Sequence, residues 1–149
     1  MNLAEKIELL KSQLNELDEN LKEVDTACKE SSDCFDLVNE SVGENLSQKD
    51  VKVLADVQKQ VIANNIDRYI IHSRIIRKIS PEIASLLEKK IDEFGKNYRA
   101  FYDVVTDPQT SKDDHIRTHK SAKRSVVEIQ NIVYISRTIT RDILGKFEK

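Results

Sequence analysis

The chain has 149 residues and a formal net charge of −2, with 34% charged residues, three glycines, two prolines and no tryptophan. This composition favours long helices with solvated faces and argues against a sheet with many turns. No run of about 18 apolar residues is present to span a bilayer, and the acidic N-terminal stretch is unlike a secretory signal peptide. We therefore expect an all-α, cytoplasmic protein that has no membrane partner.

Charge is distributed unevenly along the chain. Residues 1–50 contain 13 acidic and 5 basic side chains, whereas residues 111–149 contain 5 acidic and 9 basic ones. An acidic first helix and a basic last helix attract each other, which sets orientation within a subunit or between subunits. The two cysteines, Cys28 and Cys34, are too few for a disulfide framework, so we expect both to be reduced.

Residues 3–42 form the segment around which the chain is organised. Their apolar side chains recur at steps of four and three residues, which predicts a long, coiled-coil-like helix with one narrow apolar stripe. The predicted interaction seam of this helix comprises Leu3, Ile7, Leu10, Leu14, Leu17, Leu21 and Val24. Ser31 interrupts the repeat, and residues 31–33 offer a break at which a separate short helix would begin.

Three further helices are predicted, over residues 48–79, 81–105 and 112–147. Gly43 is expected to end the first helix, and Ser47, Ser80 and Ser111 precede the other three as N-caps. The short connections between the helices make successive helices antiparallel neighbours. The sequence thus predicts a single domain over residues 1–149, an antiparallel four-helix bundle with a long N-terminal heptad helix.

Apolar residues cover more than half of the predicted helix 48–79, so we expect it to be the most buried of the four. Inward-facing polar residues interrupt its apolar arc, and counting around the turns brings two histidines of the last helix to the same region. This candidate polar site comprises Asn65, Arg68, His72, His115 and His119. A buried guanidinium needs a partner, and Asp18 or Asp25 would lie opposite Arg68.

Two interpretations of this candidate polar site remain open. Buried polar layers commonly fix helix register or oligomeric state, which is a structural role. Alternatively, histidines near an arginine and an asparagine would supply acid–base chemistry and an anion clamp, as in an enzyme or a small-ligand or phosphate-binding protein. The sequence contains no glycine-rich phosphate loop, no nucleophile elbow and no di-iron motif, so no catalytic residue is assigned.

His115 and His119 have the spacing of four residues that places two imidazoles on one metal ion. However, Lys112 and Lys123 share the same face and would repel a cation, so we expect no metal and no cofactor. The last helix also carries a basic strip that consists of Lys112, Arg117, Lys120, Lys123 and Arg124. Nucleic-acid binding through this strip is an alternative function, but no aromatic residues alternate with the basic ones to stack on bases.

The length of the first helix carries the functional prediction. Forty residues span roughly 60 Å, whereas the predicted helix 81–105 spans only about 37 Å, so the first helix should overhang the bundle. An exposed apolar seam would favour association, which predicts a homo-oligomer. We therefore expect a non-catalytic protein–protein interaction module, an adaptor, inhibitor or assembly factor, that binds itself or another protein through the heptad helix and the overhanging end of the last helix.

Overall fold

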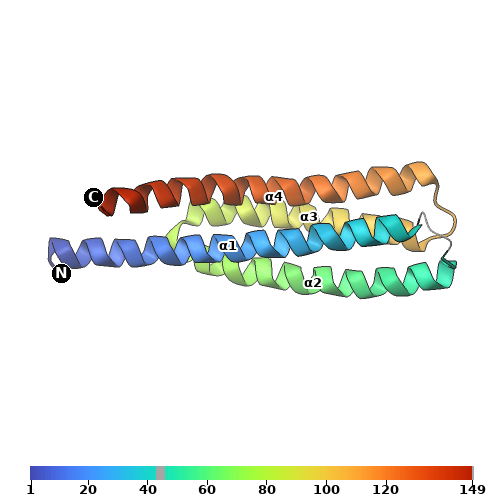
Figure 1. Ribbon diagram of the computed structural model, residues 1–149, viewed down its shortest axis with the longest axis horizontal. Coiled ribbons are helices and arrows are strands. Elements are labelled where there is room, and N and C mark those ends of the chain that lie inside the picture. The colour runs from blue at the N-terminus through green and yellow to red at the C-terminus, as the bar shows by residue number, and fades with distance from the viewer. Residues whose placement is uncertain (43–45, 149) are drawn as a thin grey trace.

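The computed structural model describes residues 1–42 and 46–148, and the chain folds into four long helices. They are α1 (Leu3–Val42), α2 (Gln48–Ile79), α3 (Pro81–Thr106) and α4 (Lys112–Phe147). Helices α1 and α3 each pack against both α2 and α4, so the four helices form a closed ring around one core. Figure 1 shows them side by side along a common long axis. The predicted all-α, antiparallel four-helix bundle is confirmed.

Serine N-caps start three of the helices. The hydroxyl oxygens of Ser47 and Ser111 accept hydrogen bonds from the backbone amides three residues later, each at 3.1 Å. Asp114 completes a capping box by accepting from the Ser111 amide at 3.4 Å, which satisfies a further amide at the helix start. Gly43, expected to end α1, lies outside the described residues.

Helix α1 continues through Ser31 without a break. The hydroxyl of Ser31 donates to the Ala27 carbonyl oxygen one turn earlier, at 2.9 Å, and the side chain is fully buried. A serine that bonds back to its own helix is compatible with a helix interior. The predicted single helix over residues 3–42 is therefore confirmed, and the alternative of a break at residues 31–33 is wrong.

Aromatic rings from α1, α2 and α3 fill the centre of the core. Phe35 of α1 packs edge-on against Phe101 of α3 with the ring centres 5.6 Å apart, and Tyr69 of α2 meets Phe94 of α3 in the same way at 5.7 Å. Such edge-to-face pairs are more favourable than stacked sandwiches because the rings carry a quadrupole. Helix α3, which has nine buried residues out of 26, supplies most of these rings.

Helix α2 is less buried than its sequence suggests. It has seven buried residues out of 32, and Val57 and Ile71 remain 55% and 54% exposed. The two neighbours of α2 cover only part of its circumference, whereas its apolar residues are spread over a wider arc. The prediction that residues 48–79 form the most buried helix is wrong.

Helices α1 and α4 extend beyond α2 and α3 at one end of the molecule. In Figure 1, α1 and α4 run past the turn between α2 and α3, and both termini lie at this end. Within residues 1–42 and 46–148, no helix has an apolar stretch long enough to cross a membrane.

Candidate functional site

A groove opens where α1 and α4 project beyond the turn between α2 and α3. Its volume is about 440 Å³, within the size range of binding sites in proteins. We call it the terminal groove. Its lining is aliphatic or uncharged polar and comprises Leu10, Gln13, Leu14, Leu17, Ile79, Ser80, Ile83, Leu86, Ile135, Ser136, Ile139, Thr140 and Ile143.

The turn at Ser80 opens this groove because it ends α2 and starts α3 without a linker. The Ser80 hydroxyl oxygen accepts from the Ile83 amide at 3.4 Å, and Pro81 occupies the first turn of α3, where its missing amide is not needed. The chain therefore reverses direction within a single residue between the two helices. Only α1 and α4 continue beyond this level.

The register of the helices gives the length of the projecting segments. Lys90 of α3 donates to Glu128 of α4 at 3.0 Å, so Pro81, nine residues earlier in α3, is level with Arg137, nine residues later in the antiparallel α4. Arg137 donates to Asp18 of α1 at 2.9 Å. Residues 138–147 and residues 3–17 therefore lie beyond the turn, over roughly 15 Å and roughly 22 Å.

The structure divides the predicted interaction seam into two parts. Leu17, Leu21 and Val24 are at most 4% exposed, so they are covered within the same chain. The part of the seam nearer the N-terminus is open, comprising the exposed Leu3 and Leu10 and the half-buried Ile7 and Leu14. Within one chain, only the first four residues of the seam remain open or half-open to solvent.

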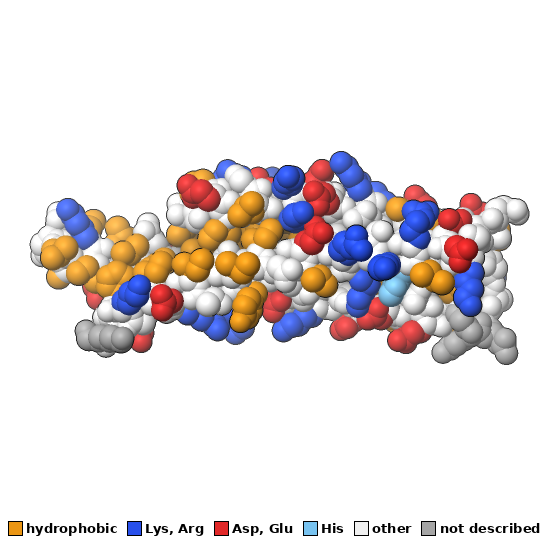
Figure 2. Space-filling model, turned by 90° about the horizontal axis from the view of Figure 1, so that it is seen from above, with side chains coloured by type: hydrophobic (Ala, Val, Ile, Leu, Met, Phe, Trp, Pro, Cys, Tyr) orange, Lys and Arg blue, Asp and Glu red, His pale blue; other side chains and the backbone are white. Residues whose placement is uncertain are grey.

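Three aliphatic side chains of the terminal groove are largely exposed to solvent. Leu86 of α3 and Ile135 and Ile139 of α4 are each more than half exposed. Figure 2 shows hydrophobic side chains gathered on this face toward the end that carries both termini, while mixed charges dominate the other half. A contiguous apolar area rimmed by polar residues is typical of a protein interaction site.

The candidate polar site is only partly assembled. Asn65 is buried and donates to the Ser31 hydroxyl at 3.1 Å, and this hydroxyl also lies 3.2 Å from the Tyr69 hydroxyl. Arg68 donates to Glu30 at 2.7 Å and to the Asn65 side-chain oxygen at 3.2 Å. The prediction that Asp18 or Asp25 is the partner of Arg68 is therefore wrong.

His72, four residues after Arg68 on α2, forms a separate pair with Asn20 of α1. Its Nδ1 lies 2.8 Å from the side-chain oxygen of Asn20, which α1 contributes. Partial burial lowers the pKa of His72 below its ordinary value; the negative charge of Glu23 raises it and the positive charge of Arg68 lowers it further. The neutral imidazole is therefore the form that fits this interface.

The histidines of α4 do not join this layer. His115 lies 3.0 Å from the Thr110 hydroxyl in the connection between α3 and α4, and His119 lies 3.2 Å from Asp36 of α1. The predicted single layer containing all five residues is therefore wrong. In the part of the chain that the structure describes, no three His, Cys, Asp or Glu side chains form a group that could hold a metal ion.

The basic strip is partly neutralised by acidic neighbours. Lys123 donates to Asp36 at 2.8 Å, and Arg117 donates to Asp114 at 3.4 Å. Burial raises the pKa of the Asp36 carboxyl, but the hydrogen bonds and positive charges of Lys123 and His119 more than offset it, so its pKa lies below the ordinary value. Two of the five cations of the strip thus serve contacts within the chain.

An ion pair between α1 and α4 was not anticipated from the sequence. Asp18 and Arg137 are 16% and 18% exposed, and Arg141 lies 3.5 Å from the same carboxylate. Burial raises the pKa of Asp18, but the two arginines lower it below the ordinary value overall. The only signal in the sequence is the opposite charge of the first and last helices, which does not identify the residues.

Comparison with protein-family models, with curated protein sequences and with solved structures gives no match. The assignment of a function therefore depends on the geometry of the terminal groove and on the charges around it.

Proposed function

We propose that this protein is a non-catalytic helical interaction module of the adaptor, inhibitor or assembly-factor kind, and that the terminal groove is its binding surface. The observation that carries the proposal is the aliphatic lining of this groove at the point where α1 and α4 run past the turn between α2 and α3. Two of its polar side chains already bond within the chain: Thr140 donates to the Ser136 carbonyl oxygen at 2.7 Å, and the Ser80 hydroxyl oxygen accepts from the Ile83 amide.

The proposed occupant is a second copy of the same chain. Residues 3–17 and 138–147 form an antiparallel helix pair, which is half of the cross-section found in the rest of the bundle. A copy related by a two-fold axis would add its own pair to the open side and restore a four-helix cross-section over about three turns. The same surface would then be used on both copies, as closed dimers require.

The charges of the projecting segments support self-association. Residues 3–17 carry three acidic and two basic side chains, and residues 138–147 carry one acidic and two basic side chains. Together they are neutral, so two copies do not repel each other at this end. Because the two segments have opposite net charges, α1 of one copy would also attract α4 of the other.

The proposed compartment is the cytoplasm. Cys28 and Cys34 are free and buried, and burial raises the pKa of the Cys28 thiol to about 12. A protonated, enclosed thiol reacts slowly and suits a reducing compartment.

Light scattering coupled to gel filtration tests the proposed dimer. We expect the wild-type protein to have twice the mass of one chain at micromolar concentrations and Ile139→Asp to have the mass of one chain. The control is Val57→Asp, because Val57 is 55% exposed on α2 and Ile139 is 56% exposed in the terminal groove. Both variants should keep their helix content by circular dichroism, since neither side chain is in the core.

A wild-type mass of one chain at all concentrations would refute the second copy as occupant. A dimer that Ile139→Asp leaves intact would move the interface away from the terminal groove. If Val57→Asp dissociates the dimer as well, the effect is not specific to this groove, and the proposal fails.

A further inference from the structure

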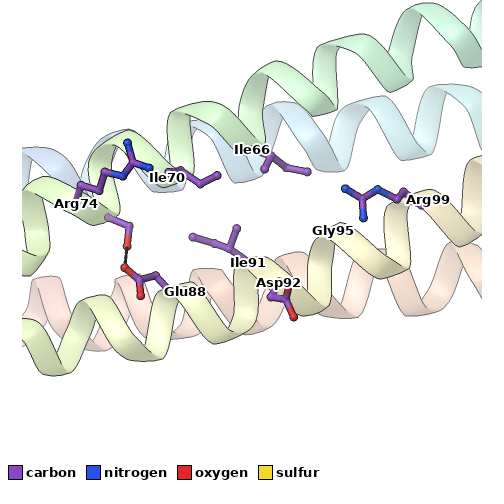
Figure 3. Close-up of a pocket in the computed structure, with 9 residues that line it drawn as sticks. Ile66, Ile70, Arg74, Glu88, Ile91, Asp92, Gly95 and Arg99 are labelled. Atoms are coloured by element: carbon purple, nitrogen blue, oxygen red, sulfur yellow. Dashed lines mark hydrogen bonds between the residues drawn. The ribbon is translucent and has the colours of Figure 1, made fainter.

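A second groove lies between α2 and α3, on a different part of the bundle from the terminal groove. Its volume is about 350 Å³. Aliphatic side chains from both helices form its middle, and an arginine stands at each end (Figure 3). We call it the α2–α3 groove, and its defining residues are Ile66, Ile70, Arg74, Ile91, Gly95 and Arg99.

Gly95 is the residue that leaves this groove hollow. Glycine is among the least favourable residues in the interior of a helix, because its backbone loses the most freedom on folding. The packing around the helix does not require glycine here, since a Cβ at this position would meet nothing within 4 Å apart from its chain neighbours and the adjacent backbone of its own helix. A position that is unfavourable for the helix and unfilled by the chain is consistent with space for a ligand.

The two carboxylates that line the α2–α3 groove, Glu88 and Asp92, are paired with cations that do not line it. At the first end, Glu88 accepts from Arg77 at 3.2 Å and from Ser73 at 3.3 Å, so its charge is balanced by Arg77 while Arg74 also stands nearby. At the second end, Asp92 pairs with Lys96 at 3.4 Å, beside Arg99. Among the described residues neither Arg74 nor Arg99 forms an ion pair, and the Arg99 guanidinium lies 5.5 Å from the centre of the Tyr98 ring. Both arginines can therefore attract anions.

The register between the helices gives the separation of these two charges. Because Ser73 bonds to Glu88, Arg74, one residue later in α2, is level with Leu87 of the antiparallel α3. Arg99 lies twelve residues further along α3, a distance of roughly 18 Å along the groove. One small anion cannot reach both ends.

We propose that the α2–α3 groove binds an elongated apolar molecule with an anionic group at each end. The aliphatic floor takes the apolar body, and Arg74 and Arg99 each bind one terminal anion. An extended chain of fourteen carbons has thirteen bonds of about 1.5 Å, each of which advances about 1.25 Å along the zigzag, so its two terminal carboxyl carbons lie about 16 Å apart. The flexible arginine side chains accommodate the remaining difference. This site is independent of the terminal groove.

Isothermal titration calorimetry with tetradecanedioate tests the proposal. We expect one molecule to bind per chain, and tetradecanoate, which has only one carboxylate, to bind about tenfold more weakly because one charge-assisted contact is lost. Arg74→Gln and Arg99→Gln should each weaken tetradecanedioate by about tenfold. Arg124→Gln, which removes an exposed arginine of α4, should leave the affinity unchanged.

Gly95→Leu fills the hollow and should abolish binding, while circular dichroism checks that the fold is kept. Gly95→Ala serves as its control, because it removes the unfavourable glycine and should make the chain more resistant to urea. The proposal is overturned if tetradecanedioate does not bind at millimolar concentration, or if it binds no better than tetradecanoate. Binding that survives in Gly95→Leu but is lost in Ile139→Asp would assign the molecule to the terminal groove and would also overturn it.

Discussion

Two buried tyrosines allow a direct measurement of what hydrogen bonding contributes to this core. Tyr69 and Tyr102 are both at most 1% exposed. The Tyr69 hydroxyl lies 3.2 Å from the Ser31 hydroxyl, whereas the Tyr102 hydroxyl has no hydrogen-bond partner among the described residues. Burial raises the pKa of both phenols, so both are neutral at physiological pH. Replacing each by phenylalanine removes one oxygen in each case and keeps the ring.

The two substitutions should have opposite effects. Tyr69→Phe loses a satisfied hydrogen bond and should lower the free energy of unfolding by about 1 kcal/mol, since Ser31 keeps its bonds to Ala27 and Asn65. Tyr102→Phe removes a polar group that is buried without a partner, which should raise the free energy of unfolding by about 1 kcal/mol or more. The difference between the variants should therefore be about 2 kcal/mol.

Urea unfolding followed by circular dichroism measures this difference. All samples must have the same protein concentration, because association contributes to apparent stability. The slope of the unfolding free energy against urea should be unchanged, so that the midpoint alone reports stability. If Tyr102→Phe is destabilised as much as Tyr69→Phe, then the Tyr102 hydroxyl is satisfied in solution and the reasoning is refuted.

Two further predictions concern charged groups. Asp18→Asn should lower the free energy of unfolding by about 2 kcal/mol, because it leaves a mostly buried arginine without its charged partner. Arg68→Ala should lower it by less than about 1 kcal/mol, since Arg68 is one-third exposed. Equal losses of the two variants in urea unfolding would contradict this ranking. The pKa of His72 is lowered in the folded state, so its contribution to stability is present above its ordinary pKa of 6.5 and is lost as the pH falls from there toward the folded value. His72→Gln should reduce the loss of stability between about pH 7 and about pH 5, and an unchanged pH dependence would exclude His72 as its source.

Helix number and helix ends could be predicted because they depend on local chemistry. Ser80 followed by Pro81 can end one helix and start another wherever it occurs, and the structure places a turn there. The apolar repeat of residues 3–42 likewise identifies one face of a helix from spacing alone. These signals need no knowledge of which helices are neighbours.

Lateral contacts could not be predicted in the same way. Arg68 was expected opposite Asp18 or Asp25, but it bonds to Glu30, which lies one or more turns further along α1. The register is marked by the buried contact of Asn65 with Ser31, and a serine that interrupts a heptad repeat looks like a helix break in the sequence. Long charged side chains also reach across several residues, so charge pattern alone does not select among partners.

The terminal groove was predicted only in outline. The overhang of the first helix followed from its length, but the sequence did not indicate that Leu17 would be covered within its own chain while Leu10 stays open. That distinction depends on where the turn at Ser80 lies relative to α1. The α2–α3 groove was missed altogether, and Gly95, one of the three glycines in the chain, was the one signal available.

The ring of helices also constrains the order in which the chain can fold. Contacts between α2 and α3 join residues as close as 8 apart, as in Arg77 with Ser85, whereas Asp18 of α1 and Arg137 of α4 are 119 residues apart. Closing the longer loop costs about 2 kcal/mol more in chain entropy. Hairpins of successive helices should therefore form first, and the interface between α1 and α4 should form last. During synthesis, α1 leaves the ribosome long before α4 exists to cover it, so its apolar stripe has only α2 as a partner at that stage.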